Sequence, residues 1–84
     1  MTYYTYLLKT ISPGKARTYA GYTIDLKKRL NKHNSNKGAK FTKGRKWKIV
    51  FKKIFKTKKE AMSFEYKLKK DRTIRKKILE NINL

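Results

Sequence analysis

The sequence predicts an α+β protein, and three observations lead to this fold class. Two runs rich in aromatic and β-branched residues flank a Pro-Gly pair, as the strands of a β-hairpin flank their turn. A third run alternates apolar residues with lysines from Trp47 onward and continues through Ile54 and Phe55, which predicts a strand with one covered face. Between and after these runs, apolar residues recur at helical spacing.

The first two strands are expected at residues 3–9 and about 16–22, joined by a turn at residues 12–15. Alternate side chains of a strand lie on the same face of a sheet. Tyr6 and Tyr19 therefore meet if the two faces that carry them coincide.

The first helix is expected to begin after Thr23, which is a suitable N-cap, and to run to about residue 34. Asp25 then lies in the first turn, where a negative charge is favourable. Leu26 and Leu30 are four positions apart and form the buried stripe of this helix.

Residues 34–46 form a cationic loop that contains glycine and one aromatic residue. It either contacts phosphates, through side chains and through amide nitrogens near Gly44, or is a solvated connection. The candidates for nucleic-acid binding in this loop and in the helix before it are Lys28, Lys32, Lys40, Lys43 and Arg45.

The second helix begins with a capping box at residues 57–60, the strongest local signal of a helix start in the chain. Ala61, Phe64 and Leu68 form its buried stripe, and Glu65 lies directly beside that stripe.

A last helix is expected to start near Thr73 and to bury Ile74, Ile78 and Ile82, while its basic residues stay in solvent. The sequence shows no internal repeat and no linker. We therefore expect one domain over residues 1–84.

Charge is the dominant feature of the composition. The 25 Lys and Arg against 5 Asp and Glu give a formal net charge of +20, which attracts polyanions such as a phosphate backbone. Most of these cations are lysines, which contact phosphates as point charges, so we expect little base specificity. A biased base composition of the source genome also explains part of the lysine excess, but the electrostatic consequence remains.

The absence of cysteine excludes disulfides and thiolate metal sites and fits a reducing compartment. No stretch approaches the roughly 18 apolar residues that a membrane span needs. A cytoplasmic protein is therefore expected.

Two tyrosine motifs and three later residues resemble the GIY-YIG nuclease family. The motifs are residues 4–6 (YTY) and 19–21 (YAG), which keeps Gly21, and they are followed by Arg29, His33 and Glu65. The likeness extends over about residues 3–79 and is similar to the family's short stand-alone members. It implies a small three-stranded antiparallel β-sheet flanked by helices.

The motifs depart from the family pattern at three positions. Tyr4 and Thr5 stand where Gly and Ile would be, and Ala20 replaces Ile. The asparagine that many members have near the end of the domain has only two candidates here, Asn81 and Asn83.

Phosphodiester hydrolysis needs an activated water, a cation for the non-bridging oxygens and a way to neutralise the leaving oxygen. Glu65 would hold one Mg²⁺ or Mn²⁺ ion, Arg29 would contact the scissile phosphate, and Tyr19 would take a proton from the water. Tyr6 and His33 would support this proton transfer.

Each of these residues also has an ordinary structural explanation. Glu65 can be a surface glutamate paired with Lys69 one turn later, and Arg29 can be one helix cation among many. The tyrosines can pack in the sheet, and His33 can be a solvated helix residue.

The first hypothesis is thus a metal-dependent DNA endonuclease that cuts selected DNA structures in repair or recombination, such as branched or nicked DNA, with a protein partner that supplies specificity. The second is a non-catalytic DNA- or RNA-binding module on the same scaffold. A basic protein on an anionic membrane is a third, disfavoured alternative.

Overall fold

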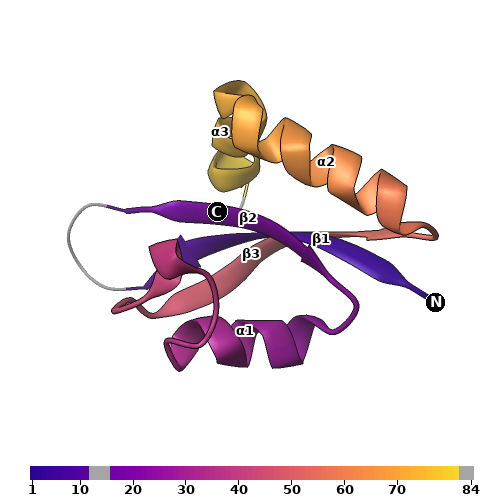
Figure 1. Ribbon diagram of the computed structural model, residues 1–84. Helices are drawn as coiled ribbons and strands as arrows, with labels where there is room; N and C mark the ends of the chain where they lie inside the picture. Colours follow the sequence, from indigo (N-terminus) through magenta and orange to yellow (C-terminus); the bar gives the residue numbers. More distant parts are fainter. Residues whose placement is uncertain (12–15, 82–84) are drawn as a thin grey trace.

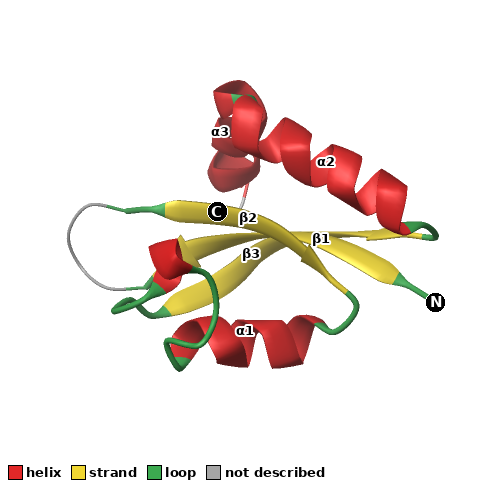
Figure 2. Ribbon diagram, viewed as in Figure 1, coloured by secondary structure: helices red, strands yellow, loops and turns green. Residues whose placement is uncertain are grey.

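The sheet has three antiparallel strands, with the first strand in the centre. A computed structural model describes residues 1–11 and 16–81, with the elements β1 (Tyr3–Thr10), β2 (Thr18–Thr23), α1 (Leu26–Asn34), the short 3₁₀ helix η1 (Lys40–Thr42), β3 (Trp47–Phe55), α2 (Lys58–Lys70) and α3 (Arg72–Asn81). The strand order is β2-β1-β3. Figure 1 shows α1 on one face of the sheet and α2 with α3 on the other, and Figure 2 shows the loops that join them.

This arrangement confirms the expected α+β class, a small three-stranded antiparallel sheet flanked by helices. The turn expected at residues 12–15 lies outside the described residues.

Alternation along β1 divides the core between the two faces of the sheet. Tyr6 and Leu8 are buried with Trp47 on the side that α1 covers. Leu7 is buried with Leu68 of α2 on the other side. Because Tyr6 belongs to the first cluster, its hydroxyl group is enclosed between the sheet and α1.

The register of the hairpin brings the two motif tyrosines to one face. Tyr6 lies opposite Gly21, and Leu8 lies opposite Tyr19. Tyr19 packs against the same core cluster as Tyr6. The expectation that the two faces coincide is therefore confirmed.

The N-cap expected for the first helix was wrong. Thr23 is the last residue of β2, and its Oγ1 accepts a hydrogen bond from the backbone nitrogen of Asp25 at 3.2 Å. Asp25 is the N-cap, because its carboxylate accepts from the backbone nitrogen of Lys28 at 3.0 Å. The carboxylate two residues further on therefore caps the helix in place of the threonine.

The capping box expected at the start of α2 is confirmed. Thr57 Oγ1 accepts from the backbone nitrogen of Glu60 at 3.2 Å, and its hydroxyl group donates to Glu60 Oε1 at 2.9 Å. Ala61 and Leu68 are buried, and half-buried Phe64 packs against the same cluster. These residues pack α2 against the sheet.

The last helix begins one residue earlier than expected, at Arg72, because Asp71 holds its first turn. The carboxylate of Asp71 accepts from the backbone nitrogens of Thr73 at 2.9 Å and Ile74 at 3.3 Å. Ile82, expected to be buried, lies outside the described residues.

Two of the motif departures have clear packing reasons. Thr5 is fully buried, and its hydroxyl group donates to the carbonyl oxygen of Ala61 at 2.7 Å, which ties β1 to the first turn of α2. Ala20 is buried in the cluster with Leu7 and Leu68. These positions face α2, away from the motif tyrosines, so the substitutions alter the packing of the other layer.

One asparagine fixes the long loop between α1 and β3. Asn34 Oδ1 accepts from the backbone nitrogen of Trp47 at 2.7 Å, and Asn34 Nδ2 donates to the carbonyl oxygen of Trp47 at 3.1 Å. The indole nitrogen of Trp47 donates to the carbonyl oxygen of Thr42 at 3.1 Å. These bonds hold η1 beside the face of the sheet that carries the tyrosines.

Candidate active site

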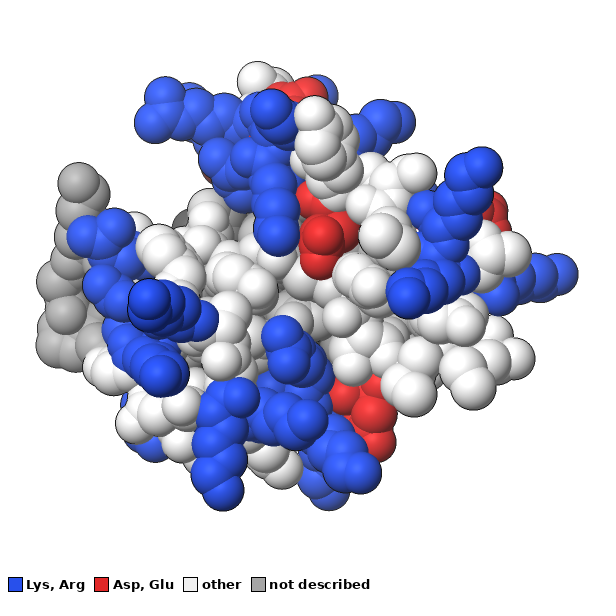
Figure 3. All heavy atoms as spheres, viewed as in Figure 1, with Lys and Arg blue, Asp and Glu red and all other residues white. Residues whose placement is uncertain are grey.

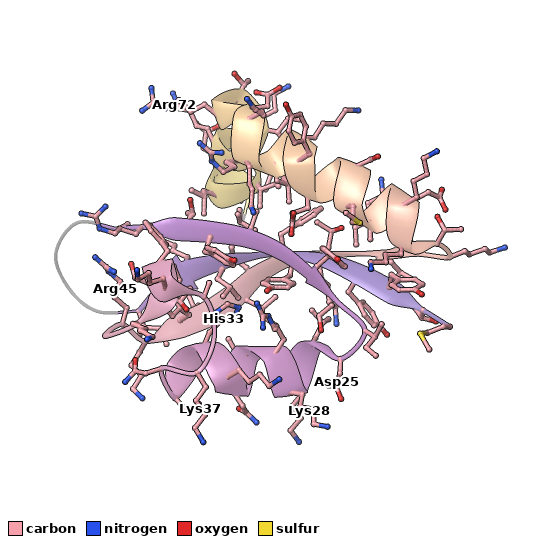
Figure 4. All side chains as sticks on the ribbon, in the orientation of Figure 1. Asp25, Lys28, His33, Lys37, Arg45 and Arg72 are labelled. Atoms are coloured by element: carbon pink, nitrogen blue, oxygen red, sulfur yellow. The ribbon has the colours of Figure 1, made fainter. Side chains whose placement is uncertain are left out.

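A chain of hydrogen bonds joins Arg29, Tyr6, His33 and Thr42 across α1, β1 and η1. Arg29 Nε donates to the hydroxyl oxygen of Tyr6 at 3.3 Å, and this oxygen lies 3.0 Å from His33 Nε2. His33 Nδ1 lies 2.9 Å from Thr42 Oγ1, which donates to the carbonyl oxygen of Ala39 at 2.8 Å. Figure 4 shows His33 between the sheet and α1.

The direction of every bond in this chain follows from its two ends. Because the single hydroxyl hydrogen of Thr42 goes to Ala39, Thr42 Oγ1 accepts from Nδ1–H of His33. In the neutral imidazole, Nε2 is then the acceptor, so it receives the hydroxyl hydrogen of Tyr6. The Tyr6 oxygen in turn accepts from Arg29. The contacts therefore fix the tautomer of His33 and the protonated state of Tyr6.

Burial keeps His33 neutral. Its side chain is fully buried, and this desolvation, with the positive charge of Arg29, lowers its pKa from 6.5 to about 4. A Cβ atom at Gly38 would overlap His33 Nδ1, so the glycine lets the loop close over the imidazole. The alternative of a solvated helix residue does not describe this histidine.

The same enclosure acts on Tyr6 and Arg29. Burial raises the pKa of Tyr6, although the hydrogen bond and the charge of Arg29 oppose the rise. The hydrogen bond with Tyr6 raises the pKa of Arg29 above its already high ordinary value. Tyr6 is thus a fixed hydroxyl group, and Arg29 is a permanent positive charge held against it.

Tyr19 lies beside this chain but is more open to solvent. It is half-buried on the edge strand β2, and its ring centroid lies 5.2 Å from that of His33, with the planes tilted by 59°. Tyr19 also adds to the raised pKa of Arg29, which places its phenol within electrostatic reach of the guanidinium. Of the two motif tyrosines, Tyr19 is the one that a substrate can approach.

Glu65 belongs to α2 and is linked to the site through Lys69. Its side chain is 20% exposed and forms an ion pair with Lys69 at 3.6 Å, and Lys69 Nζ lies 5.7 Å from the ring centroid of Tyr19. The negative charge of Glu65 contributes to the raised pKa of Tyr6. Within residues 1–11 and 16–81, Glu65 forms no hydrogen bond to Arg29 or to either tyrosine.

The structure therefore brings the five candidate residues together to different degrees. Arg29, Tyr6 and His33 are in direct contact, Tyr19 packs on His33, and Glu65 is connected by charge and by Lys69. The expected pairing of Glu65 with Lys69 is present as well, so the glutamate fits both of its interpretations.

The basic candidates lie on two sides of this cluster. Exposed Lys28 and Lys32 line a hollow of about 280 Å³ together with Arg29 at the start of α1. Lys40 and Lys43 are exposed around η1. Figure 3 shows Lys and Arg side chains along most of the outline of this face, around a mostly uncharged area in which acidic atoms are also visible. No helix in the described part of the chain has the length and apolar character to cross a membrane.

One of the backbone amides expected near Gly44 as phosphate donors is used within the loop. The backbone nitrogen of Gly44 donates to Asn36 Oδ1 at 2.7 Å, so it is already used within the loop. Arg45 also stabilises the loop, because its Nη1 atom donates to the carbonyl oxygen of Phe41 at 3.1 Å. The amide of Gly44 itself is therefore not a candidate for phosphate contact.

Glu65 is the only one of the five candidate residues that offers a metal a carboxylate. No three His, Cys, Asp or Glu side chains among the described residues gather as a metal site. Mg²⁺ is commonly held by one or two carboxylates, with substrate phosphate and water as the other ligands. A single partly buried glutamate such as Glu65 fits that mode, and no all-protein cage is required.

Sequence reasoning missed Thr42 and Gly38. Both act on His33 from a loop, and neither has a fixed spacing to the histidine that a helix or strand would impose. The one available signal was the glycine itself, since a glycine in a loop often marks a close approach.

The order of the elements, with Tyr6 in contact with Arg29 and His33, defines a small α+β domain with a buried polar cluster. A family model described as the GIY-YIG catalytic domain matches residues 2–77. The chain belongs to this family. The resemblance seen in the two tyrosine motifs is confirmed.

Similar proteins include short bacterial relatives. A UPF0213 protein of Bacillus pumilus is 47% identical over 68 residues, which are 80% of this chain and 66% of the relative. UPF0213 protein YazA of Bacillus subtilis is 55% identical over 53 residues, which are 62% of this chain and 54% of the relative. The chain thus spans between half and two thirds of the length of these curated relatives.

A solved structure supports the fold. The solution NMR structure of UPF0213 protein BH0048 from Bacillus halodurans has a TM-score of 0.53 and 37% sequence identity, and the match covers 99% of this chain and 86% of that one. The names of these relatives state no activity, so the nuclease class rests on the family match.

Proposed function

We propose that this protein is a metal-dependent endonuclease that hydrolyses DNA phosphodiester bonds by water attack, with residues 1–84 acting as one domain. The observation that supports this most is the directed chain from Thr42 through His33 and Tyr6, which holds Arg29 beside Tyr19. A purely structural sheet does not need a buried histidine to orient a tyrosine toward an arginine.

Arg29 is proposed to bind the scissile phosphate. Its Nε atom is engaged by Tyr6, so the terminal nitrogens of the guanidinium are the ones directed to a non-bridging oxygen. A permanently protonated arginine stabilises the charge that grows on these oxygens in the transition state. Because Tyr6 and His33 fix its position in advance, little reorganisation is needed when the substrate binds.

Tyr19 is proposed to accept, as its phenolate, a proton from the attacking water. It is the less buried tyrosine, and Arg29 and Lys69 place positive charge near its ring. Tyr6 and His33 are assigned a positioning role, since both are buried and their hydrogen atoms are committed to each other and to Thr42.

Glu65 would hold one Mg²⁺ or Mn²⁺ ion. Such an ion lowers the pKa of bound water and stabilises charge on phosphate oxygens. Glu65 Oε1 lies 3.6 Å from Lys69 Nζ, so a divalent cation at this carboxylate would compete with the lysine.

Lys28, Lys32, Lys40, Lys43 and Arg45 are proposed to hold the DNA backbone on either side of Arg29. These contacts are independent of sequence. Selection of branched or nicked DNA, in repair or recombination, then depends on the shape of the substrate and on a partner protein.

A non-catalytic DNA- or RNA-binding module is the second candidate. It is favoured by the ion pair of Glu65 with Lys69, because this pairing satisfies the carboxylate without a metal. The two candidates differ in what happens when Glu65 loses its charge.

The test is a cleavage assay on single-stranded, duplex and branched DNA with Mg²⁺ or Mn²⁺. Glu65→Gln is compared with Glu80→Gln, an exposed glutamate of α3, so that both variants lose one negative charge. We expect Glu65→Gln to abolish cleavage and Glu80→Gln to retain it, while both bind DNA as the unmodified protein does. Cleavage by Glu65→Gln at the full rate would reject the metal site. Binding without cleavage by the unmodified protein on every DNA would favour the module.

A further inference from the structure

An exposed aromatic layer lies next to the candidate active site. Phe41, in η1, is 46% exposed, although its ring stacks on Tyr19 with centroids 6.2 Å apart and planes 21° from parallel. Trp47 supports Phe41 from the core at 6.1 Å. The ring of Tyr19, the proposed proton acceptor, and the exposed ring of Phe41 therefore form one flat surface.

A cationic side chain lies over each of the two rings, Phe41 and Tyr19. The guanidinium of Arg45 lies over Phe41, 5.6 Å from its centroid, and Lys69 Nζ lies 5.7 Å from the centroid of Tyr19. Aromatic rings and guanidinium planes are the groups on which proteins stack unpaired nucleotide bases. Phe41 and Arg45 together provide both kinds of surface.

Two hollows with basic lining residues lie beside this layer, along β2. A hollow of about 360 Å³ has Tyr19, Phe41, Lys69 and Arg75 among its lining residues. A second hollow of about 580 Å³ shares Thr18 and Arg75 with the first and adds basic residues of α3. Because the two hollows share lining residues, they are adjacent, and together we call them the basic path.

Arginines concentrate on this path, whereas lysines are spread over the chain. Of the five arginines in the sequence, Arg29 is in the site, and Arg45, Arg72 and Arg75 line the path or its aromatic layer. Figure 4 shows Arg45 and Arg72 toward the same end of the molecule. Arginine binds phosphate with a planar, multidentate group and stacks on bases, so this choice favours a nucleotide strand over general charge attraction.

We infer that this path binds one unpaired strand of the substrate, with a base stacked on the Phe41–Arg45 layer and its phosphates at Arg72 and Arg75. Arg75 Nη1 donates to the carbonyl oxygens of Leu68 and Lys69, so its other guanidinium nitrogens are the ones for a phosphate. The inference rests on the proposed function, because it takes a nucleic acid as substrate. Within a duplex, both faces of a base are covered by its neighbours. A base reaches Phe41 only when it leaves the stack, so the strand is unpaired next to the bond that is cut.

The test measures binding without cleavage, in EDTA, by fluorescence anisotropy. The two probes are a labelled oligothymidylate and an abasic deoxyribose-phosphate strand of the same length. Phe41→Leu is compared with Tyr66→Leu, because Tyr66 is also exposed, at 61%, and also has a cation over its ring, Lys70 Nζ at 5.4 Å. Tyr66 lies on α2 in a different hollow, beside Met62.

We expect Phe41→Leu to lose about fivefold or more in affinity for oligothymidylate and to bind the abasic strand unchanged. Phe41→Trp should restore the preference for the strand that has bases, and Tyr66→Leu should alter neither affinity. Equal losses on both probes, or no loss on oligothymidylate, would overturn the inference. A thermal melt of Phe41→Leu, and the Phe41→Trp variant, separate loss of stacking from loss of folding.

Arg72→Gln tests the phosphate part of the path. The substitution should weaken the binding of both probes. It should also reduce the slope of log affinity against log salt concentration by about one unit. An unchanged salt dependence would remove Arg72 from the path.

The result is distinguishable from that of the proposed function. If no DNA is cut while Phe41 still selects the strand with bases, the endonuclease fails and the stacking site stands. If Glu65-dependent cleavage is found and Phe41→Leu binds normally, the stacking site alone fails.

Discussion

Gly21 lies opposite Tyr6 in the register of β1 and β2, and a Cβ atom at position 21 would overlap the hydroxyl oxygen and Cζ of Tyr6. The glycine of the second motif therefore provides the space in which the phenol of the first motif lies. Tyr6 needs this position to contact both His33 and Arg29. The two motifs are thus parts of one packing arrangement.

Gly21→Ala should destabilise the fold and displace the Tyr6 hydroxyl group. The cost arises from overlap with Tyr6, so it should largely disappear in a Tyr6→Leu background, where the overlapping atoms are absent. Urea unfolding of the two single variants and the double variant measures this coupling, which we expect to exceed about 1 kcal/mol. An equal cost of Gly21→Ala in both backgrounds would show that the glycine serves the backbone instead.

His33 is the only histidine in the sequence, so its titration can be observed alone. Its pKa is about 4 in the folded chain and has the ordinary value of 6.5 when the chain unfolds. Below pH 6.5 the unfolded chain binds a proton that the folded chain does not. Stability should therefore be complete above pH 6.5 and fall as the pH approaches 4, by about 2 kcal/mol between pH 7 and pH 5.

His33→Gln is the control for this pH effect. The variant should be less stable at pH 7, because Tyr6 and Thr42 lose their partner, but its stability should stay nearly constant between pH 7 and pH 5. Denaturant unfolding at several pH values, with an NMR titration of the histidine ring, makes the measurement. A histidine that titrates near 6.5 in the folded protein would contradict the burial of His33 within the chain of hydrogen bonds.

The sequence predicted the parts of this molecule that depend on near neighbours in the chain. The capping box at Thr57 and the strand alternation that brings Tyr6 and Tyr19 to one face are both of this kind. The N-cap was missed because Thr23 and Asp25 compete for it two residues apart. The hydrogen bonds of the Thr23 and Asp25 side chains decide which residue is the N-cap. These hydrogen bonds depend on where β2 ends.

The chain of hydrogen bonds could not be predicted from sequence, because it depends on how a loop folds back. Thr42 meets His33 only because Asn34 and Trp47 fix the loop and Gly38 lets it close. Glu65 could be placed beside a helical stripe. Its distance from the tyrosines depends on how α2 lies on the opposite face of the sheet, which no local pattern determines.

Arg29→Lys should reduce the proposed cleavage by about a hundredfold or more while DNA binding stays nearly unchanged. The substitution keeps the charge of +1 but removes the Nε–H that Tyr6 accepts, so the cation is no longer held in place. Lys58→Ala, at the start of α2, loses a whole charge and should affect turnover by less than about twofold. Single-turnover cleavage and anisotropy separate the two effects. A loss of turnover in Lys58→Ala with none in Arg29→Lys would mean that only total charge matters.

Lys69→Gln should make the protein respond to less divalent metal. The substitution removes the cation that occupies the Glu65 carboxylate at 3.6 Å, so an incoming ion no longer has to displace it. An exposed ion pair of this type is worth roughly 0.2–1 kcal/mol, and the Mn²⁺ concentration for half-maximal cleavage should fall by up to about fivefold. The measurement is a Mn²⁺ titration at saturating DNA, with Lys70→Gln as the control, because Lys70 has the same charge but lies over Tyr66. A midpoint that shifts equally in both variants would show that the metal responds to general charge, and Glu65 would lose its assignment as the ligand.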